Sequence, residues 1–86
     1  MLTPSQLRAA RAMLNWTRDH LAEKSGTAAV TIVGFEHSKT DPKISTLQKW
    51  KRALTAAGLL FIEDDGEHGP GIRQRDSEAK LRKRAQ

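Results

Sequence analysis

The sequence predicts an all-α fold, a compact domain of four helices, on three observations. Apolar residues recur three and four positions apart along four separate stretches, as they do on one face of an α-helix. Residues that favour helix ends separate these stretches from one another. The chain has 86 residues and no cysteine, so one hydrophobic core without disulfides has to stabilise it.

The first predicted helix covers residues 4–14. Thr3 is a suitable N-cap, and Pro4 suits the first turn because the N–H group that it lacks would have no partner there. The apolar stripe that follows consists of Leu7, Ala10 and Leu14.

The second predicted helix covers residues 18–24. Thr17 is a suitable N-cap, and the negative charge of Asp19 suits the positive end of the helix dipole. We expect Gly26 to end this helix in a left-handed conformation, which glycine adopts without steric cost.

The third predicted helix covers residues 29–36, with Ile32 and Phe35 as its buried pair. The fourth covers residues 44–57, and Gly58, the next residue, terminates it. Its apolar stripe, which we assign to the core, consists of Leu47, Trp50, Leu54 and Ala57.

The C-terminal part of the sequence has no helical spacing. Residues 59–62 are apolar and favour a strand, the next stretch is rich in turn residues, and Ile72 follows, so the sequence allows a short β-ribbon. From residue 76 onward no apolar periodicity is left. We therefore expect one folded domain over residues 1–75 and a disordered basic tail over residues 76–86.

Positive charge is concentrated at the C-terminal end of the sequence. The whole chain has a formal charge of +5. Residues 1–72 hold nine Lys and Arg against eight Asp and Glu, whereas residues 73–86 hold six against two. The body of the chain is nearly neutral, so its charge alone does not indicate a nucleic-acid-binding protein.

Whole classes of function are excluded by what the sequence lacks. No apolar stretch approaches the roughly 20 residues that cross a bilayer, so we expect no membrane partner. The histidines show no metal-ligand spacing, and His20 beside Asp19 has no accompanying nucleophile. We expect a cytoplasmic protein that is not an enzyme and holds no metal or other cofactor.

Two of the predicted helices and the turn between them form a helix-turn-helix pattern. Ala22 is small enough to let the second helix approach, Gly26 supplies the turn, and Phe35 helps to anchor the second helix. The stretch 10–36 resembles the Cro/C1-type repressor family, and the resemblance continues to about Ile72. It implies a compact helix-turn-helix fold and a role in the control of transcription.

In that family, the first turns of the second helix of the motif contact base edges in the major groove. The resemblance implies that the corresponding surface, facing either DNA or a protein partner, consists of Ala28, Ala29, Val30, Thr31, Val33 and Gly34. None of these side chains makes a bidentate hydrogen bond to a base, so specificity would have to come from thymine methyl groups and DNA shape. The phosphate contacts that it implies are from Arg18, Lys39 and Lys43.

The apolar character of this surface leaves two main functions open. Exposed apolar patches mark protein-binding surfaces, and Gly34 in an exposed helix suggests a closely approaching partner. The sequence is also similar to quorum-sensing antiactivators of rhizobial mobile elements, which bind transcriptional activators. It therefore favours an antiactivator whose partner is a transcriptional activator protein. The alternative is a Cro/C1-type repressor of a double-stranded DNA operator, an antitoxin is a third reading, and a homodimer stays open.

Overall fold

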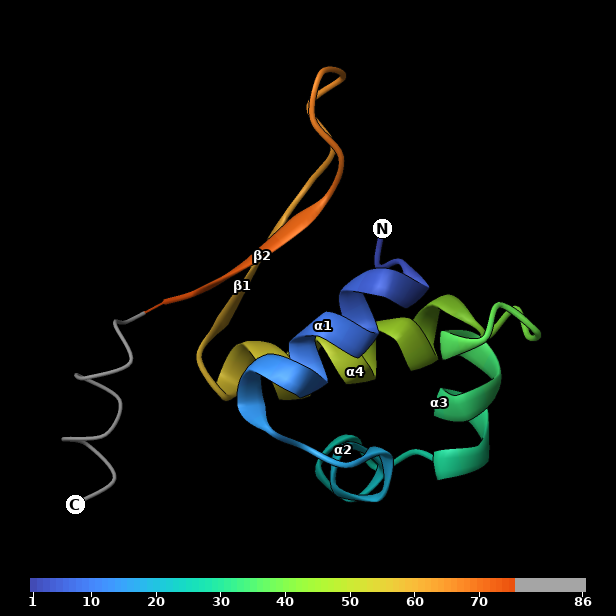
Figure 1. Cartoon of the computed structure of the whole chain (residues 1–86). Coiled ribbons are helices and arrows are strands. Elements are labelled where there is room, and N and C mark those ends of the chain that lie inside the picture. Colours follow the sequence, from blue (N-terminus) through green and yellow to red (C-terminus); the bar gives the residue numbers. More distant parts are fainter. Residues whose placement is uncertain (76–86) are drawn as a thin grey trace, which may run out of the picture.

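The structure, a computed structural model, describes residues 1–75, which form four helices followed by two strands (Figure 1). These elements are α1 (Pro4–Leu14), α2 (Arg18–Ser25), α3 (Ala29–Glu36), α4 (Ile44–Ala56), β1 (Leu59–Ile62) and β2 (Gly71–Gln74). All four predicted helices are confirmed, with one residue more in α2 and one fewer in α4. The predicted disordered tail, residues 76–86, lies outside the described residues. No helix within residues 1–75 is long and apolar enough to cross a membrane.

The described chain is not purely all-α, because its last two elements pair as an antiparallel sheet. Leu60 lies opposite Arg73, and Ile62 lies opposite Gly71. The ribbon that the sequence allowed is therefore present, and the predicted all-α class is corrected to four helices and a small sheet. The physical reason is that Gly58, at φ 106°, turns the chain away from the axis of α4 before a run of strand-favouring residues.

The helix ends follow the predicted capping residues. Thr3 Oγ1 accepts a hydrogen bond from the Gln6 backbone N at 3.1 Å, and the Thr3 backbone N donates to Gln6 Oε1 at 3.0 Å, which completes a capping box. Thr17 Oγ1 accepts from the His20 backbone N at 3.0 Å. Gly26 has the predicted left-handed conformation, with φ 69°.

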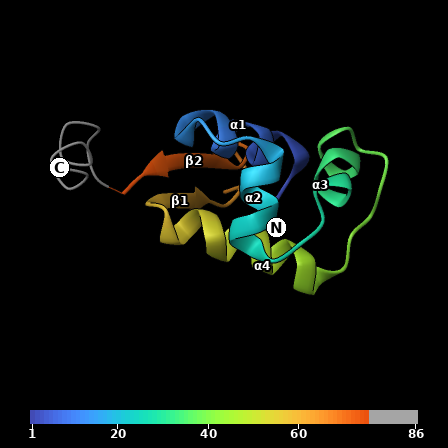
Figure 2. The same ribbon diagram turned by 90° about the horizontal axis from the view of Figure 1, so that it is seen from below.

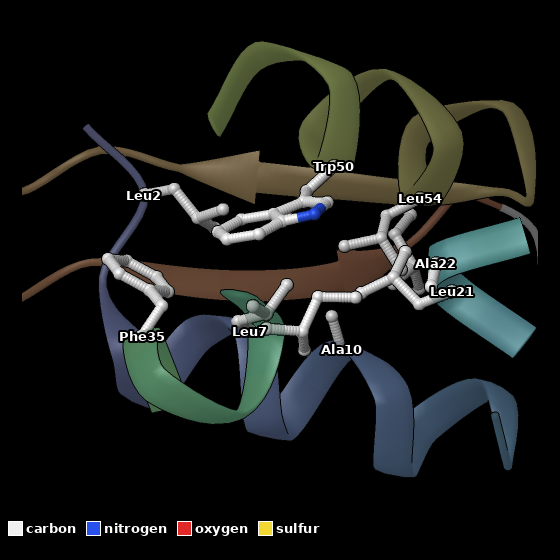
Figure 3. Close-up of a cluster of buried hydrophobic side chains, with 10 residues drawn as sticks. Leu2, Leu7, Ala10, Leu21, Ala22, Phe35, Trp50 and Leu54 are labelled. Carbon is white, nitrogen blue, oxygen red and sulfur yellow. The ribbon is translucent and has the colours of Figure 1, made fainter. Parts of the chain in front are cut away.

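Trp50 lies at the centre of the core, between side chains from α1, α2, α3 and the N-terminal segment (Figure 3). Its indole ring is fully buried, and its centroid lies 5.3 Å from that of Phe35. The sheet lies between α1 and α4, with β2 beside α1 and β1 beside α4 (Figure 2). The sheet thus closes one side of the core, while α2 and α3 close the other.

Candidate nucleic-acid interface

The α2 and α3 helices form the predicted helix-turn-helix. After Gly26 the chain turns sharply, and the Thr27 backbone N donates to the Ala22 carbonyl oxygen at 3.0 Å. Ala22 is buried, with 8% of its surface exposed, as expected for a small residue where two helices meet. Ile32 and Phe35 are the buried anchors of α3, as predicted.

Side-chain hydrogen bonds attach the turn to α4. Thr27 Oγ1 accepts from Trp50 Nε1 at 2.8 Å and lies 2.9 Å from Ser25 Oγ. The buried indole N–H group therefore has a partner, which avoids the cost of an unsatisfied donor. Because Thr27 directly precedes the N-cap of α3, this contact fixes where that helix begins.

Three arginines hold the C-terminal end of α3. The fully buried carboxylate of Glu36 accepts hydrogen bonds from Arg11 Nε at 2.6 Å, from Arg11 Nη2 at 2.8 Å and from Arg18 Nε at 2.9 Å. Arg8 Nη1 donates to the Glu36 carbonyl oxygen. Residues of α1 and α2 thus fix the last turn of α3, and a cation there also suits the helix dipole.

The environment of Glu36 keeps its carboxylate charged. Burial raises the pKa of Glu36, but hydrogen bonds and charges from Arg11 and Arg18 outweigh burial and hold it below its ordinary value of 4.5. The side chains of Arg11 and Arg18 are 17% and 36% exposed. Two guanidinium groups bind this carboxylate and a third binds the backbone carbonyl of the same residue, so the cluster contains more positive than negative charge.

The residues predicted to face a binding partner do not all lie on one surface. Val30 is 76% exposed, and Ala28 is exposed beside it at the start of α3. Ala29 packs against the core, and Thr31 and Val33 are half-buried. Of the predicted binding surface, the part that is apolar and freely accessible is therefore the first turn of α3.

Gly34 is explained within the chain, which corrects the expectation of a closely approaching partner. A Cβ atom added at Gly34 would lie 2.6 Å from Cγ2 and 3.0 Å from Oγ1 of Thr40. The carbonyl oxygen of Gly34 also accepts from the Lys39 backbone N at 2.8 Å. Gly34 makes room for the segment that follows α3, so the predicted apolar patch loses this residue.

The predicted phosphate-contacting residues fall into two groups. Lys39 and Lys43 are exposed on either side of Pro42, in the segment between α3 and α4, and neither forms an ion pair with another residue of 1–75. Arg18 is instead bound through Nε to Glu36, although its side chain is 36% exposed. The two lysines are free to bind an anion, whereas Arg18 is held in one orientation.

The N-terminus of α3 has no side-chain cap. Ala28 occupies the N-cap position without a side-chain hydrogen bond, and the first turn contains no acidic residue. The first backbone N–H groups of α3 therefore stay available to an acceptor outside the helix.

Comparison with known proteins identifies the fold family. The model of the family described as "Helix-turn-helix" matches residues 7–55, which is more than half of the chain. The chain belongs to the helix-turn-helix family. This family is one of DNA-binding regulators rather than enzymes, and the predicted Cro/C1 type is supported.

Similar proteins occur in Mycobacterium tuberculosis. The protein named Antitoxin HigA1 is 44% identical over 43 residues in strain CDC 1551 / Oshkosh and equally in strain ATCC 25618 / H37Rv. The match covers 50% of this chain but 29% of each relative. The chain thus spans less than a third of the length of the curated relatives that it matches.

The arginine cluster on Glu36 and the Thr27 contact were not predicted from the sequence. One signal was available for the first: Glu36 ends a helix that is otherwise almost entirely apolar, and Arg8 and Arg11 lie one turn apart on α1. A lone acid in an apolar helix needs a positive partner when it is buried. Nothing in the sequence indicates the contact between Thr27 and Trp50, because it depends on how α4 packs against the turn.

Proposed function

We propose that this protein is a transcription regulator that binds double-stranded DNA and inserts the first turn of α3 into the major groove. The observation that carries this proposal is the exposed N-terminal turn of α3 on a helix-turn-helix that belongs to a family of DNA-binding regulators. The C-terminal end of the same helix is fixed by Glu36. Such a helix has the rigidity and the accessible end that groove insertion needs.

The exposed side chains of this turn are of a kind that can contact the methyl group of thymine. Ala28 and Val30 are exposed and apolar, and apolar side chains contact the C5-methyl group of thymine in the major groove. Lys39 and Lys43 are exposed in the segment that follows the C-terminal end of α3, and we assign to them contacts with phosphates of the DNA backbone. We therefore expect weak base selectivity, a preference for A·T pairs and marked salt dependence.

An antiactivator that binds a transcriptional activator is the second candidate, and one observation favours it. Val30 is 76% exposed and apolar, and neither exposed side chain of this turn, Ala28 or Val30, has a group that could hydrogen-bond to a base. Against it, Ala29 packs inward and Gly34 is covered by Thr40, so the exposed apolar area shrinks to one helical turn. Protein-binding patches are usually several hundred Å² in area.

Substitution of Val30 by lysine separates the two candidates. A lysine at this position adds a phosphate-binding charge, so Val30→Lys should keep or raise DNA affinity while weakening A·T preference. The same lysine would be buried in a protein interface and should abolish the activator complex. Met13→Lys is the matched control, because Met13 is an exposed apolar residue on α1, away from the motif.

Fluorescence anisotropy with duplexes from the promoter of the protein's own gene measures DNA affinity. Lys39→Ala and Lys43→Ala should each weaken binding and lower the salt slope by about one unit, because each lost phosphate contact releases one counterion fewer. If both lysine variants bind DNA and regulate a reporter as the unmodified protein does, the DNA-binding proposal is wrong. Loss of regulation in Val30→Lys alone would then support the antiactivator.

A further inference from the structure

Two open hollows lie next to each other on the exposed face of α4, in the half of that helix that leads to the sheet. Arg52 and Ala56 line both of them, so the two hollows form one continuous surface, which we call the basic strip. Its cationic side chains come from the end of α2, from α4 and from the residue after β2; they are those of Lys24, Lys49, Lys51, Arg52 and Arg75.

The positive charges of the basic strip are not balanced within the described part of the chain. No acidic residue lines either hollow. Lys24, Lys49, Arg52 and Arg75 are exposed, and none of them forms an ion pair with another residue of 1–75. Like charges that lie together repel one another, so an anion that binds among them removes a cost that the isolated domain carries.

The backbone holds Arg75 beside α4. The Arg75 N–H group donates to the Gly58 carbonyl oxygen at 2.7 Å, which continues the pairing of β1 and β2 by one step. Gly58 directly follows Ala57, the C-cap of α4, so this hydrogen bond places the end of β2 next to the end of the helix. The fold thus brings together cations that are far apart in the sequence.

The basic strip is separate from the surface that we propose for groove insertion. Lys39 and Lys43 precede α4, whereas the residues of α4 that line the strip begin at Gln48 and end at Ala56. At a rise of about 1.5 Å per residue, Ala56 lies roughly 20 Å along the helix axis from Lys43. In Figure 1, α3 lies toward the N-terminal end of α4, and β1 begins at the opposite end.

The charge of the chain itself indicates that the ligand of the basic strip comes from outside. The sequence after Arg75 contains four Lys and Arg against two acidic residues, so its net charge has the same sign as that of the strip. Double-stranded DNA carries one negative charge per about 1.7 Å of its axis, roughly twice the density of an extended acidic peptide, which has at most one per about 3.3 Å. DNA therefore suits a surface with several close cations better than an acidic peptide does.

We propose that the basic strip binds the phosphate backbone of double-stranded DNA outside the segment that α3 contacts. Arg52 lies at the centre of this contact, because it lines both hollows, and Lys49 and Arg75 extend it to either side. Phosphate contacts contain no base information, so binding at this site is independent of sequence and is strongly weakened by salt. The choice of DNA as the ligand rests on the proposed function, but the strip includes no residue of α3, so either proposal can fail without the other.

Fluorescence anisotropy of the full chain with a duplex of arbitrary sequence tests the strip in a background that lacks the other surface. This background is Val30→Glu combined with Lys39→Ala and Lys43→Ala, and it should still bind the duplex at low salt. Adding Ala56→Glu places a carboxylate between the two hollows and should weaken the remaining binding at least about tenfold. Adding Ala12→Glu is the matched control, because Ala12 is an exposed alanine near the end of α1 and its substitution should leave binding unchanged.

Removal of single charges measures the contacts one by one. In the same background, Lys49→Gln and Arg52→Gln should each lower the slope of log K against log salt concentration by about 0.9, because one counterion fewer is released. Nuclear magnetic resonance of the unmodified protein gives the location of binding. The backbone amide signals of Ser25 and Ala56, which line the strip, should shift as the duplex is added. Circular dichroism checks that each variant is folded.

Three results would overturn the proposal. The first is a background variant that does not bind the duplex at low salt. The second is an equal effect of Ala56→Glu and Ala12→Glu. The third is binding of polyglutamate to the strip as tightly as DNA of the same total charge, which would identify an acidic protein segment as the ligand. If the background binds as tightly as the unmodified protein and Ala56→Glu abolishes binding, the strip is supported and groove insertion by α3 is wrong.

Discussion

At the scale of single residues, Glu36 links stability to pH. The arginines hold the pKa of Glu36 below 4.5, so the folded state binds a proton less readily than the unfolded state. The stabilisation by Glu36 is therefore complete above pH 4.5 and is lost as the pH falls through the pKa of the folded state. The pKa values of Glu63 and Asp65 are also lowered, so several carboxylates contribute to the overall loss of stability in acid.

Substitution of Glu36 isolates its share of this effect. We expect Glu36→Gln to lower the free energy of unfolding at neutral pH by on the order of 3 kcal/mol, because Arg11 loses its counter-charge in a largely buried site. The difference from the unmodified protein should shrink as the pH falls below 4.5. Urea denaturation at neutral and at acidic pH measures it, with Glu23→Gln on the exposed surface as control. A difference that stays constant with pH would contradict the assignment.

At the scale of elements, α3 and the segment after it are coupled through Gly34 and Thr40. Alanine in a helix is favoured over glycine by about 1 kcal/mol, but a Cβ atom at position 34 would press on Thr40 Cγ2. Gly34→Ala alone should therefore bring no gain in stability. Combined with Thr40→Ala, the same change should stabilise the domain by about 1 kcal/mol.

Thermal denaturation of the four proteins of this double-mutant cycle gives the coupling energy between the two positions. The single variant Thr40→Ala provides the reference for the added alanine. If Gly34→Ala stabilises the protein equally in the presence of Thr40 and of Ala at position 40, the steric contact with Thr40 does not contribute to stability. The glycine at position 34 would then need another explanation.

Element boundaries were predictable because capping is a local property. Thr3, Thr17, Gly26 and Gly58 act on backbone groups within a few residues of themselves, and the sequence shows those neighbours. The surface of α3 was predicted less well. Helical spacing indicates which residues face one packing partner, but Thr40 reaches Gly34 from a segment without periodic structure. Sequence spacing therefore does not indicate this contact, which forms only when the chain is folded.

At the scale of the whole molecule, the core is formed within the described residues. Its buried cluster joins the N-terminal segment, all four helices and β1, and the partly buried Ile72 of β2 packs against it. The sequence of residues 76–86 has one leucine and no apolar spacing. We therefore expect removal of residues 76–86 to leave the thermal midpoint within about two degrees of its original value.

Differential scanning calorimetry of the shortened and full chains measures that midpoint. Because association can raise an apparent midpoint, both chains are compared at the same low concentration. A broad transition or a large drop after truncation would show that the last eleven residues contribute to the core.

The residues that anchor α3 and the residues that we propose for target binding lie in different halves of this helix. Ile32, Phe35 and Glu36 attach the second half of this helix to the rest of the domain. Ala28 and Val30, at its start, contribute little to packing. Mutations at these two positions can therefore accumulate with little penalty to folding. Descendants of one such gene could acquire new targets by single substitutions, and an engineer could retarget the scaffold by randomising the same two positions.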